Sequence, residues 1–511
     1  MKTIIIGLDG ASFELIDPWI KQGALPNIAS IKRDGIWADM ESVLPPVTSP
    51  NWKCFSTGRN PGKLGIFWWE NIDWTNRRVY YPTARKSENK EIWDYIGDAG
   101  MKVGIIGMPN TYPPKKVNGF LVAGGPDAQE QGFTYPAELE KELKKQGWRN
   151  NPQEMLSIAR EKSSQETHEI IDRHFKIANI LRDKYELDFL MVAVFHSNSL
   201  QHFLWNAPET KKAWEIIDKQ IGEFVKQDSD IIVMSDHGSN KITEVFNINT
   251  WLEQEGYLSL NLKITSIIYR LGITRRNLIT LLSQVKARSA IRKLVPNSLW
   301  ERLYAEIPNE TGEIMKKAKT SKVDWKKSKA LASGQGPIYL NPRNKDNDRL
   351  KKEIKQKLEN LVSPSTGDKI VEKVYSKEEI YHGKYLNEAP DLIIDQAKGV
   401  HIPGGIGQRG IFDSPQRWKA ENKKIGLFMA YGPNIKKAGK IDNISILDLA
   451  PTILHLMNIT IPNDMDGRVL KEIFRENSLP AKSEVKSMPV EIDEPERVKK
   501  KVKWLKDRME I

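Results

Sequence analysis

Asp9, Thr48, Asp236 and His237 are the residues whose side chains could do chemistry together. Two carboxylates, an imidazole and a hydroxyl make the mixed oxygen and nitrogen ligand set that zinc and other divalent ions accept. A threonine hydroxyl becomes a nucleophile when such an ion lowers its pKa, and the amides at a helix start can bind the phosphate group that it attacks. Taken singly, these residues have ordinary interpretations, as turn residues or, for Thr48, as a helix cap. Their joint occurrence favours metal-assisted phosphoryl transfer.

Predicted strands place most of these residues at one edge of a sheet. Short apolar runs alternate with amphipathic helical stretches, which predicts an α/β fold with a mostly parallel sheet and helices on both faces. Asp9 and Asp236 each follow a predicted strand, and chemistry in such sheets collects at the carboxyl ends of the strands. The prolines around Thr48 predict that helix begins only at Trp52. The clearest strands are 4–8, 103–106, 120–123, 189–195, 231–234 and 427–431.

Insertions are predicted to interrupt a single catalytic core. The 511 residues suffice for a core at 1–260 and 324–470, with a helical insertion at about 135–184 in the first part. The basic amphipathic stretch 261–323 is predicted to form a helical cap; the alternative, contact with a membrane surface, stays open. The polar residues 471–511 are predicted to form a charged linker and a terminal helix.

Composition narrows the class of protein. The hydrophobic share of 39% and the charged share of 28% are ordinary for a globular chain, and no apolar run is long enough for a transmembrane helix. A net charge of +12 suits an anionic substrate or membrane face. The basic residues are not interleaved with aromatics, so no nucleic-acid polymer is expected as a partner. The single Cys54 and the lack of an apolar leader predict a cytoplasmic protein.

Several motifs together give the chain a family resemblance. It resembles the alkaline phosphatase superfamily and, within it, the type I phosphodiesterase and nucleotide pyrophosphatase branch, from residue 1 to about 470. The resemblance implies an alkaline-phosphatase-like sheet with helical cap insertions. Its marks are Gly7-Leu8-Asp9-Gly10, Leu25-Pro26-Asn27, the Thr48 segment with Ser56-Thr57-Gly58, Gln201-His202-Phe203, Ser235-Asp236-His237-Gly238, Ala389-Pro390-Asp391-Leu392 and Asp464-Met465-Asp466-Gly467.

The resemblance implies two metal ions, of which the sequence supports one. Asp9, Thr48, Asp236 and His237 match the ligands of the first ion, and Thr48 matches the nucleophile. His202 matches one ligand of the second ion. The other two positions, an Asp and a His in the family, are Asn198 and Asn422 here. Neutral amides bind a dication weakly because they bring no charge to offset it.

Three explanations of the amides are open. The second ion is absent, with His202 or a nearby cation acting on the leaving group; or it persists, with His401 or His196 as a replacement ligand; or the protein binds a phosphorylated ligand or partner without turnover. The Gly-rich loop that carries His401 also carries Arg409, whose guanidinium could contact phosphate. Asn71 is the closest substitute for a phosphate-contacting asparagine of the family.

The expected activity is hydrolysis of phosphate esters, most of all phosphodiesters or nucleotide-type pyrophosphates, through a phosphothreonine on Thr48. Zinc is the expected metal, with manganese and magnesium as alternatives, and His202 is the candidate base for the second step. The expected substrate is a phosphorylated small molecule or a glycan- or lipid-linked phosphate. A sulfatase is disfavoured because Thr48-Ser49-Pro50 lacks the Cys or Ser nucleophile that sulfatases use, and phosphomutases usually carry serine.

Overall fold

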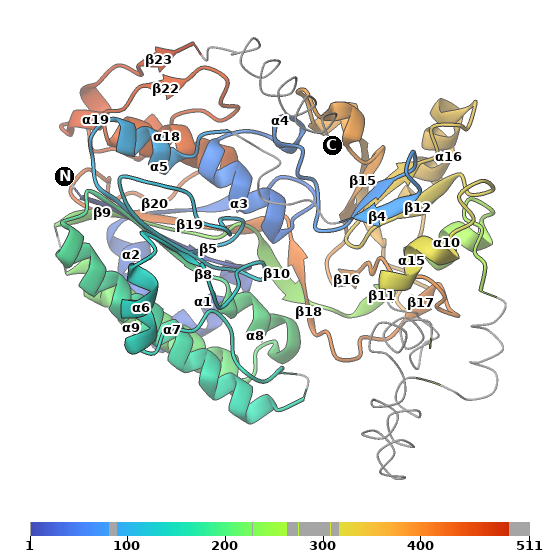
Figure 1. Ribbon diagram of the computed structural model, residues 1–511, viewed down its shortest axis with the longest axis horizontal. Helices are drawn as coiled ribbons and strands as arrows, with labels where there is room; N and C mark the ends of the chain where they lie inside the picture. Colours follow the sequence, from blue (N-terminus) through green and yellow to red (C-terminus); the bar gives the residue numbers. More distant parts are fainter. Residues whose placement is uncertain are drawn as a thin grey trace, which may run out of the picture.

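A ten-stranded sheet forms the centre of the larger part of the molecule (Figure 1). The structure is a computed structural model, and it describes residues 2–80, 89–156, 158–226, 228–262 and 316–489, together with Thr274 and Ile307. The strand order is β20-β2-β19-β9-β1-β8-β5-β6-β7, and β21 also pairs with β2. The strands are β1 (Lys2–Leu8), β2 (Ile36–Glu41), β5 (Val103–Met108), β6 (Gly119–Ala123), β7 (Thr134–Tyr135), β8 (Phe189–Val194), β9 (Ser229–Met234), β19 (Ile425–Tyr431), β20 (Gly439–Lys440) and β21 (Ile444–Ser445).

The sheet is mostly parallel, as the apolar runs predicted. β1 pairs in parallel with both β8 and β9, with Gly7 opposite Ala193 on one side and Met234 on the other. Two strands of this sheet, as far as the structure describes it, run antiparallel to their neighbours. β19 is antiparallel to β2 and β9, and β7 is antiparallel to β6. Because β1 and β9 point the same way, the residues that follow them leave the sheet at the same edge. All six strands predicted from the sequence are present.

Helices cover both faces of this sheet (Figure 1). On one face α7 packs on β5 and β8, and α9 packs on β9, α2, α7 and α8. On the other face α3 and α18 pack together and α5 packs on β5. The helices of the first face are α1 (Phe13–Lys21), α2 (Pro26–Asp34), α7 (Arg160–Tyr185), α8 (His196–Leu204) and α9 (Pro208–Val225), and those of the second are α3 (Thr48–Thr57), α5 (Ile92–Asp98), the 3-10 turn η3 (Ile446–Asp448) and α18 (Leu449–Leu456).

The prediction that residues 135–184 form a cap insertion is wrong. It contains the short α6 (Leu139–Lys145) and most of α7, and α7 lies directly on the central sheet. One side of α7 is apolar and buried, with Ile171, Phe175 and Leu181 facing the core. The remaining sides of the helix are charged. The sequence predicted an insertion because these charged residues outnumber the apolar ones. The segment is therefore part of the layered core.

A second, smaller antiparallel sheet lies beside the first (Figure 1). Its order is β12-β13-β15-β14, and it has its own cluster of buried apolar side chains. The prediction of one continuous core over 324–470 is wrong in this respect, because the chain builds the second sheet before it returns to the first at β19. The members are β12 (Ala330–Ala332), β13 (Pro337–Leu340), β14 (Val371–Ser376), β15 (Leu392–Gln396), the helices α10 (Ile248–Gln254) and α16 (Asn347–Glu359) that pack on it, and α15 (Lys316–Lys322).

Short ribbons connect the two sheets. β10 (Gly238–Lys241), which begins directly after His237, pairs antiparallel with β18 (Ala420–Lys423). β11 (Glu244–Phe246) pairs with β16 (Val400–His401) and with β17 (Phe412–Asp413). A separate hairpin joins β3 (Asn71–Asp73) to β4 (Arg78–Tyr80). These ribbons bring the loops of the smaller sheet to the edge where β1 and β9 end.

The last part of the described chain packs on the core. Leu470, Ile473 and Phe474 are buried, and β23 (Ser487–Met488) pairs with β22 (Ile461–Pro462). The prediction of a loose linker from residue 471 is therefore wrong up to residue 489, while the predicted terminal helix lies outside the described residues. The same holds for most of the predicted cap at 261–323. Within the ranges described, no helix combines the length and the apolar character needed to cross a membrane.

Candidate functional site

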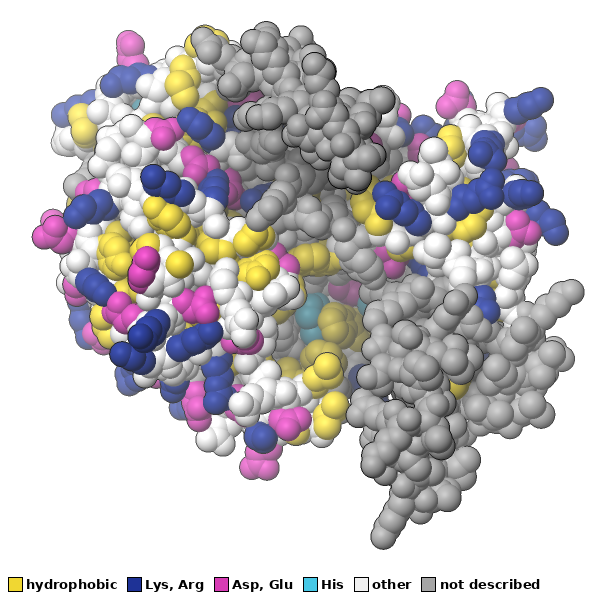
Figure 2. Space-filling view, viewed as in Figure 1, with side chains coloured by type: hydrophobic (Ala, Val, Ile, Leu, Met, Phe, Trp, Pro, Cys, Tyr) yellow, Lys and Arg dark blue, Asp and Glu magenta, His cyan; other side chains and the backbone are white. Residues whose placement is uncertain are grey.

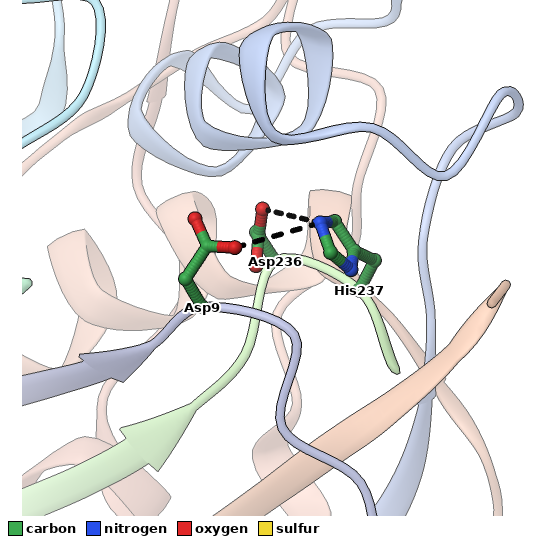
Figure 3. Close-up of side chains that lie close together, drawn as sticks. All are labelled: Asp9, Asp236 and His237. Carbon is green, nitrogen blue, oxygen red and sulfur yellow. Dashed lines mark ion pairs between the residues drawn. The ribbon is translucent and has the colours of Figure 1, made fainter. Parts of the chain in front are cut away.

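Asp9, Asp236 and His237 meet where β1 and β9 end (Figure 3). All three side chains are fully buried. Nε2 of His237 lies 3.2 Å from Oδ2 of Asp236 and 3.6 Å from Oδ1 of Asp9. Within the described ranges, these are the only three His, Cys, Asp or Glu residues whose ligand atoms all lie within 4.8 Å of one another. The structure thus brings together the three residues that the sequence predicted for the first ion.

Thr48 completes the group from the start of α3. Its Oγ1 lies 3.3 Å from His237 Nε2 and 3.5 Å from Asp9 Oδ1. The helix begins at Thr48 itself, earlier than the prolines predicted, because Pro50 sits in the first turn, where a missing N–H is tolerated. The cap position is Val47, so the Thr48 hydroxyl does not serve as the helix cap. It faces the carboxylates and the imidazole instead.

The atoms of this group could bind a cation through their lone pairs. His237 Nδ1 donates to the carbonyl of Gly238 at 2.9 Å, which leaves a lone pair on Nε2 in the neutral ring. Oδ2 of Asp236 is buried and has no hydrogen-bond partner among the described residues. Two carboxylates and one imidazole nitrogen fit a divalent ion, and such an ion would satisfy the unpartnered oxygen.

The electrostatics of the group point the same way. Burial, and then the neighbouring Asp236, raise the pKa of Asp9 to about 8. Burial raises the pKa of Asp236 to about 8 as well. Burial lowers the pKa of His237, which keeps its ring neutral. Two carboxylates this deeply buried are costly to ionise unless a cation offsets their charge.

A hydrogen bond holds each of the two carboxylates. Trp52, one turn after Thr48 on α3, donates from its indole nitrogen to Asp9 Oδ2 at 2.9 Å. The backbone amide of Gly10 donates to Asp236 Oδ1 at 3.2 Å. Sequence reasoning did not single out Trp52. Its spacing of four residues from Thr48, which places both on one side of a helix, is the signal that could have found it.

The positions predicted for a second ion carry two amides, Asn198 and Asn422, and one imidazole, His202. Asn198, on α8, makes a hydrogen bond that lowers the pKa of Asp9. Asn422, on β18, lies opposite Ser239 of β10. The side-chain oxygens of both amides are buried and have no hydrogen-bond partner in the described part of the chain. Both amides therefore lie close to the Asp9 group but add no charge to it.

His202 lies beside these amides as a neutral, packed ring. Its Nδ1 donates to the carbonyl of Ala420 at 2.8 Å, and the ring stacks on Trp418 with centroids 3.9 Å apart. Burial lowers the pKa of His202 to about 4. Its role as the base of the second step remains a prediction.

His401 makes a contact that the sequence did not predict. Its Nδ1 is hydrogen-bonded to Oε2 of Glu421, a carboxylate that is almost fully buried. Burial by itself would raise the pKa of Glu421, but His401 and its other partners lower that pKa to about 2. Glu421 directly precedes Asn422, and sequence reasoning considered only the second of the two. Alternation along a strand makes such neighbours point to opposite faces, so the choice between them needed the structure.

His196 stays a predicted replacement ligand, because its buried Nδ1 has no hydrogen-bond partner among the described residues. Its Nε2 donates to the carbonyl of Asn150 at 2.8 Å, and the ring packs edge-on against His174. Burial lowers the pKa of His196 to about 4. It belongs to a buried cluster with His174.

The two predicted phosphate contacts have different outcomes. The amide of Asn71 is buried and occupied, since Oδ1 accepts from Tyr339 at 2.9 Å and Nδ2 donates to the carbonyl of Trp68 at 3.3 Å. It therefore serves the hairpin and the smaller sheet, and a phosphate would have to displace these partners. Arg409 is exposed on the loop after β16. Its contact with phosphate stays a prediction.

The surface is hollowed between the two sheets (Figure 2). In that view a histidine side chain lies at the bottom of the hollow, with hydrophobic and acidic side chains next to it. The side of the hollow formed by the larger sheet is the edge at which β1 and β9 end.

The sequence matches the family of type I phosphodiesterases and nucleotide pyrophosphatases over residues 3–423. The chain belongs to this family. The resemblance inferred from the motifs is thereby confirmed, and the activity class of the family is that of a phosphodiesterase or pyrophosphatase. No protein with a curated description matches the sequence.

A solved structure supports the fold of this type I phosphodiesterase family member. Human ectonucleotide pyrophosphatase/phosphodiesterase 5 matches with a TM-score of 0.51 and 14% sequence identity, over 94% of this chain and 100% of that chain. Similarity at this level of identity shows the fold. The predicted alkaline-phosphatase-like α/β architecture is confirmed, with the Asp9 group of this family member at the carboxyl edge of its sheet.

Proposed function

We propose that the protein is a metal-dependent hydrolase of phosphate esters, most of all phosphodiesters or nucleotide-type pyrophosphates, that acts through a phosphothreonine on Thr48. The observation that carries the proposal is the position of the Thr48 hydroxyl. Its Oγ1 lies 3.3 Å from His237 Nε2 and 3.5 Å from Asp9 Oδ1, beside the three residues whose side chains could hold a metal ion. Family membership supports the reaction class.

Asp9, Asp236 and His237 would hold the metal ion. A bound divalent ion would lower the pKa of the Thr48 hydroxyl and offset the negative charge of the phosphate. Zinc suits the mixed carboxylate and imidazole set best, and manganese and magnesium are the alternatives. We propose one ion per chain, because Asn198 and Asn422 supply no charge for a second.

The residues of the chain have separate tasks in the first step. Thr48 Oγ1 attacks phosphorus, and Asp9 Oδ1 is a nearby acceptor for the hydroxyl proton. The amides of Thr48 and Ser49 lie in the first turn of α3, where backbone N–H groups lack intrahelical acceptors and favour an anion. In the second step water cleaves the phosphothreonine and frees Thr48, which gives overall retention at phosphorus.

The remaining parts of the proposal concern substrate and location. The substrate is a phosphorylated small molecule or a glycan- or lipid-linked phosphate, which agrees with the net charge of +12. The proposed location is the cytoplasm, with which the single buried Cys54 is consistent. Contact with a membrane surface would involve residues 261–323, most of which lie outside the described residues.

Substitution of Thr48 tests the proposal directly. The Thr48→Ala variant should lose turnover of bis(p-nitrophenyl) phosphate while it keeps its fold and nearly all of its bound metal. Thr57→Ala, at the other end of the same helix, is the matched control, because the Thr57 hydroxyl bonds only within the helix and to the next turn. Mass spectrometry of acid-quenched reactions should find a phosphate group on Thr48. Undiminished turnover by Thr48→Ala would exclude the mechanism.

The alternative is a protein that binds a phosphorylated ligand without turnover, and the amides Asn198 and Asn422 are the observation that favours it. Metal analysis and a substrate screen separate the two functions. An enzyme should retain close to one equivalent of ion and turn over at least one phosphodiester, phosphomonoester or pyrophosphate. A pure binder should bind the same compounds and leave them intact.

A further inference from the structure

A histidine and a carboxylate, His401 and Glu421, form a pair next to Asn422. Glu421 is 1% exposed, and three groups hold it. Its Oε1 accepts from Gln335 Nε2 at 2.5 Å and from the amide of Asn422 at 2.8 Å, and its Oε2 is bonded to His401 Nδ1. A carboxylate with this many partners has one fixed orientation.

His401 presents its other nitrogen away from the carboxylate. Its side chain is 21% exposed, on the two-residue strand β16. No described residue makes a hydrogen bond to Nε2. The bond at Nδ1 fixes the ring plane, so Nε2 can exchange a proton with a bound molecule while Glu421 stabilises the charged ring. This is the arrangement in which a carboxylate orients a general acid or base.

The strand pairing places this pair next to the Asp9 group. β10 starts directly after His237, and its Asn240 lies opposite Glu421 of β18. The negative charge of Glu421 acts on both His237 and His202, since it opposes the lowering of the pKa of each ring. His202 and His401 both lie against Trp418, at centroid distances of 3.9 and 6.3 Å. The pair thus lies beside His202 and His237.

The pair is not arranged as a second metal site. The ligand atoms of His202, His401 and Glu421 do not all come within 4.8 Å of one another, although all three belong to the described residues. Nδ1 of His401 and both oxygens of Glu421 already have partners. The two rings differ in what orients them: Nδ1 of His202 bonds to the backbone carbonyl of Ala420, whereas Nδ1 of His401 bonds to the carboxylate of Glu421.

We infer that His401, oriented by Glu421, is the acid–base residue that acts on the leaving group in place of a second metal ion. The inference rests on the proposed hydrolase function. In the first step the bond from Thr48 Oγ1 to phosphorus forms, the bond from phosphorus to the leaving oxygen breaks, and the His401 Nε2 proton passes to that oxygen. In the second step the bond from the water oxygen to phosphorus forms, and neutral Nε2 takes a proton from that water. The bond from phosphorus to Thr48 Oγ1 breaks, and Oγ1 takes back the proton that Asp9 Oδ1 accepted in the first step. Glu421 is a positioning residue.

A series of leaving groups tests this assignment. A general acid raises the rate little when the leaving group is stable as an anion, because such a group needs no proton to depart. It raises the rate much more when the leaving group is a poor anion. The test substrates are methyl aryl phosphodiesters whose leaving phenols range from 4-nitrophenol to phenol. Along this series the loss of kcat/KM in the variants should increase. His401→Ala should lose less than about 10-fold in kcat/KM with 4-nitrophenyl and about 10²–10⁴-fold with phenyl esters. Glu421→Gln should show the same trend with smaller losses, and added imidazole should restore part of the His401→Ala activity.

His382→Ala is the matched control. His382 also pairs with a carboxylate, Asp466, at 2.8 Å, but on the exposed surface. This variant should behave as the wild type with every ester. Circular dichroism and metal analysis accompany each variant, and His401→Gln provides a second substitution if His401→Ala does not fold.

Two results would overturn the assignment. One is an equal loss across the whole series in the His401 variants. The other is a loss of bound metal in His401→Ala or Glu421→Gln, which would make these residues ligands of an ion. Both outcomes leave the proposed function standing. A wild-type protein that cleaves no phosphate ester would remove the proposed function and this inference together.

Discussion

The indole nitrogen of Trp52 donates a hydrogen bond to Oδ2 of Asp9 across 2.9 Å. This bond joins the helix that carries Thr48 to the residue that follows strand β1. Gly7 makes the approach possible, because a Cβ at this position would lie 2.4 Å from Cη2 of Trp52. One side chain thus sets both the orientation of Asp9 and the distance of α3 from β1.

Removal of this hydrogen bond should weaken metal binding. In Trp52→Phe, Asp9 loses the donor that orients Oδ2, and loss of such an outer partner lowers metal affinity by about 10–100-fold. Titration of the metal-free protein with zinc, followed by calorimetry, measures the change. Trp214→Phe is the control, because this buried indole nitrogen has no hydrogen-bond partner among the described residues. Equal affinity in both variants would contradict the assigned role of Trp52.

Restoration of the missing ligands should recruit a second ion. Asn198 is hydrogen-bonded to Asp9, and Asn422 pairs with Ser239, two residues after His237. The side-chain oxygens of both amides have no hydrogen-bond partner among the described residues. Asn198→Asp adds a negative charge, and Asn422→His adds an imidazole nitrogen, both of which bind a dication better than an amide. The double variant should approach two bound ions per chain by elemental analysis after dialysis. If the number of bound ions per chain stays at that of the wild type, the backbone no longer places residues 198 and 422 close enough together to bind one ion.

The buried histidines should make the protein sensitive to acid. His174 stacks on Trp148 with centroids 3.9 Å apart, and burial lowers its pKa from 6.5 to about 3. Between these values the unfolded chain binds a proton that the folded chain does not. Stability therefore falls as the pH drops below about 6.5, by up to about 1.4 kcal/mol per pH unit for this group.

A His174→Gln variant isolates that contribution. Its free energy of unfolding should fall less steeply than that of the wild type between about pH 6 and pH 4, as followed by urea denaturation. Parallel curves for His174→Gln and the wild type would refute the assignment of this acid sensitivity to His174.

A buried ion pair should stabilise the junction between the sheets. Lys319 and Glu70 are 1% and 2% exposed and lie 2.7 Å apart, and Lys319 also donates to the carbonyls of Ala332 and Gly404. Lys319→Met leaves the Glu70 charge buried without its partner, which costs about 3–5 kcal/mol. Denaturation curves should show this loss, whereas Lys326→Met, at an exposed lysine, should change little. A cost below about 1 kcal/mol would mean that Glu70 finds another partner.

The candidate metal site could be predicted because the position of each of its residues depends on the neighbouring sequence. Asp9, Asp236 and His237 come directly after apolar runs, and neighbouring parallel strands bring the residues at their carboxyl ends to one edge of the sheet. The same reasoning failed for 135–184, where the charges on the outer side of α7 hid the apolar side that packs on the sheet. It also missed the smaller sheet, whose short antiparallel strands depend on partners far away in the chain.

The sequence by itself determined the α/β class, the family motifs, the first ligand set and the replacement of two further ligands by amides. Only the tertiary structure decided that Trp52 holds Asp9, that Asn71 is occupied by other partners and that Glu421 pairs with His401. The physical reason is the range of the contacts. Strand ends and helix starts depend on neighbouring residues, whereas a hydrogen bond between β16 and β18 depends on how two sheets pack together.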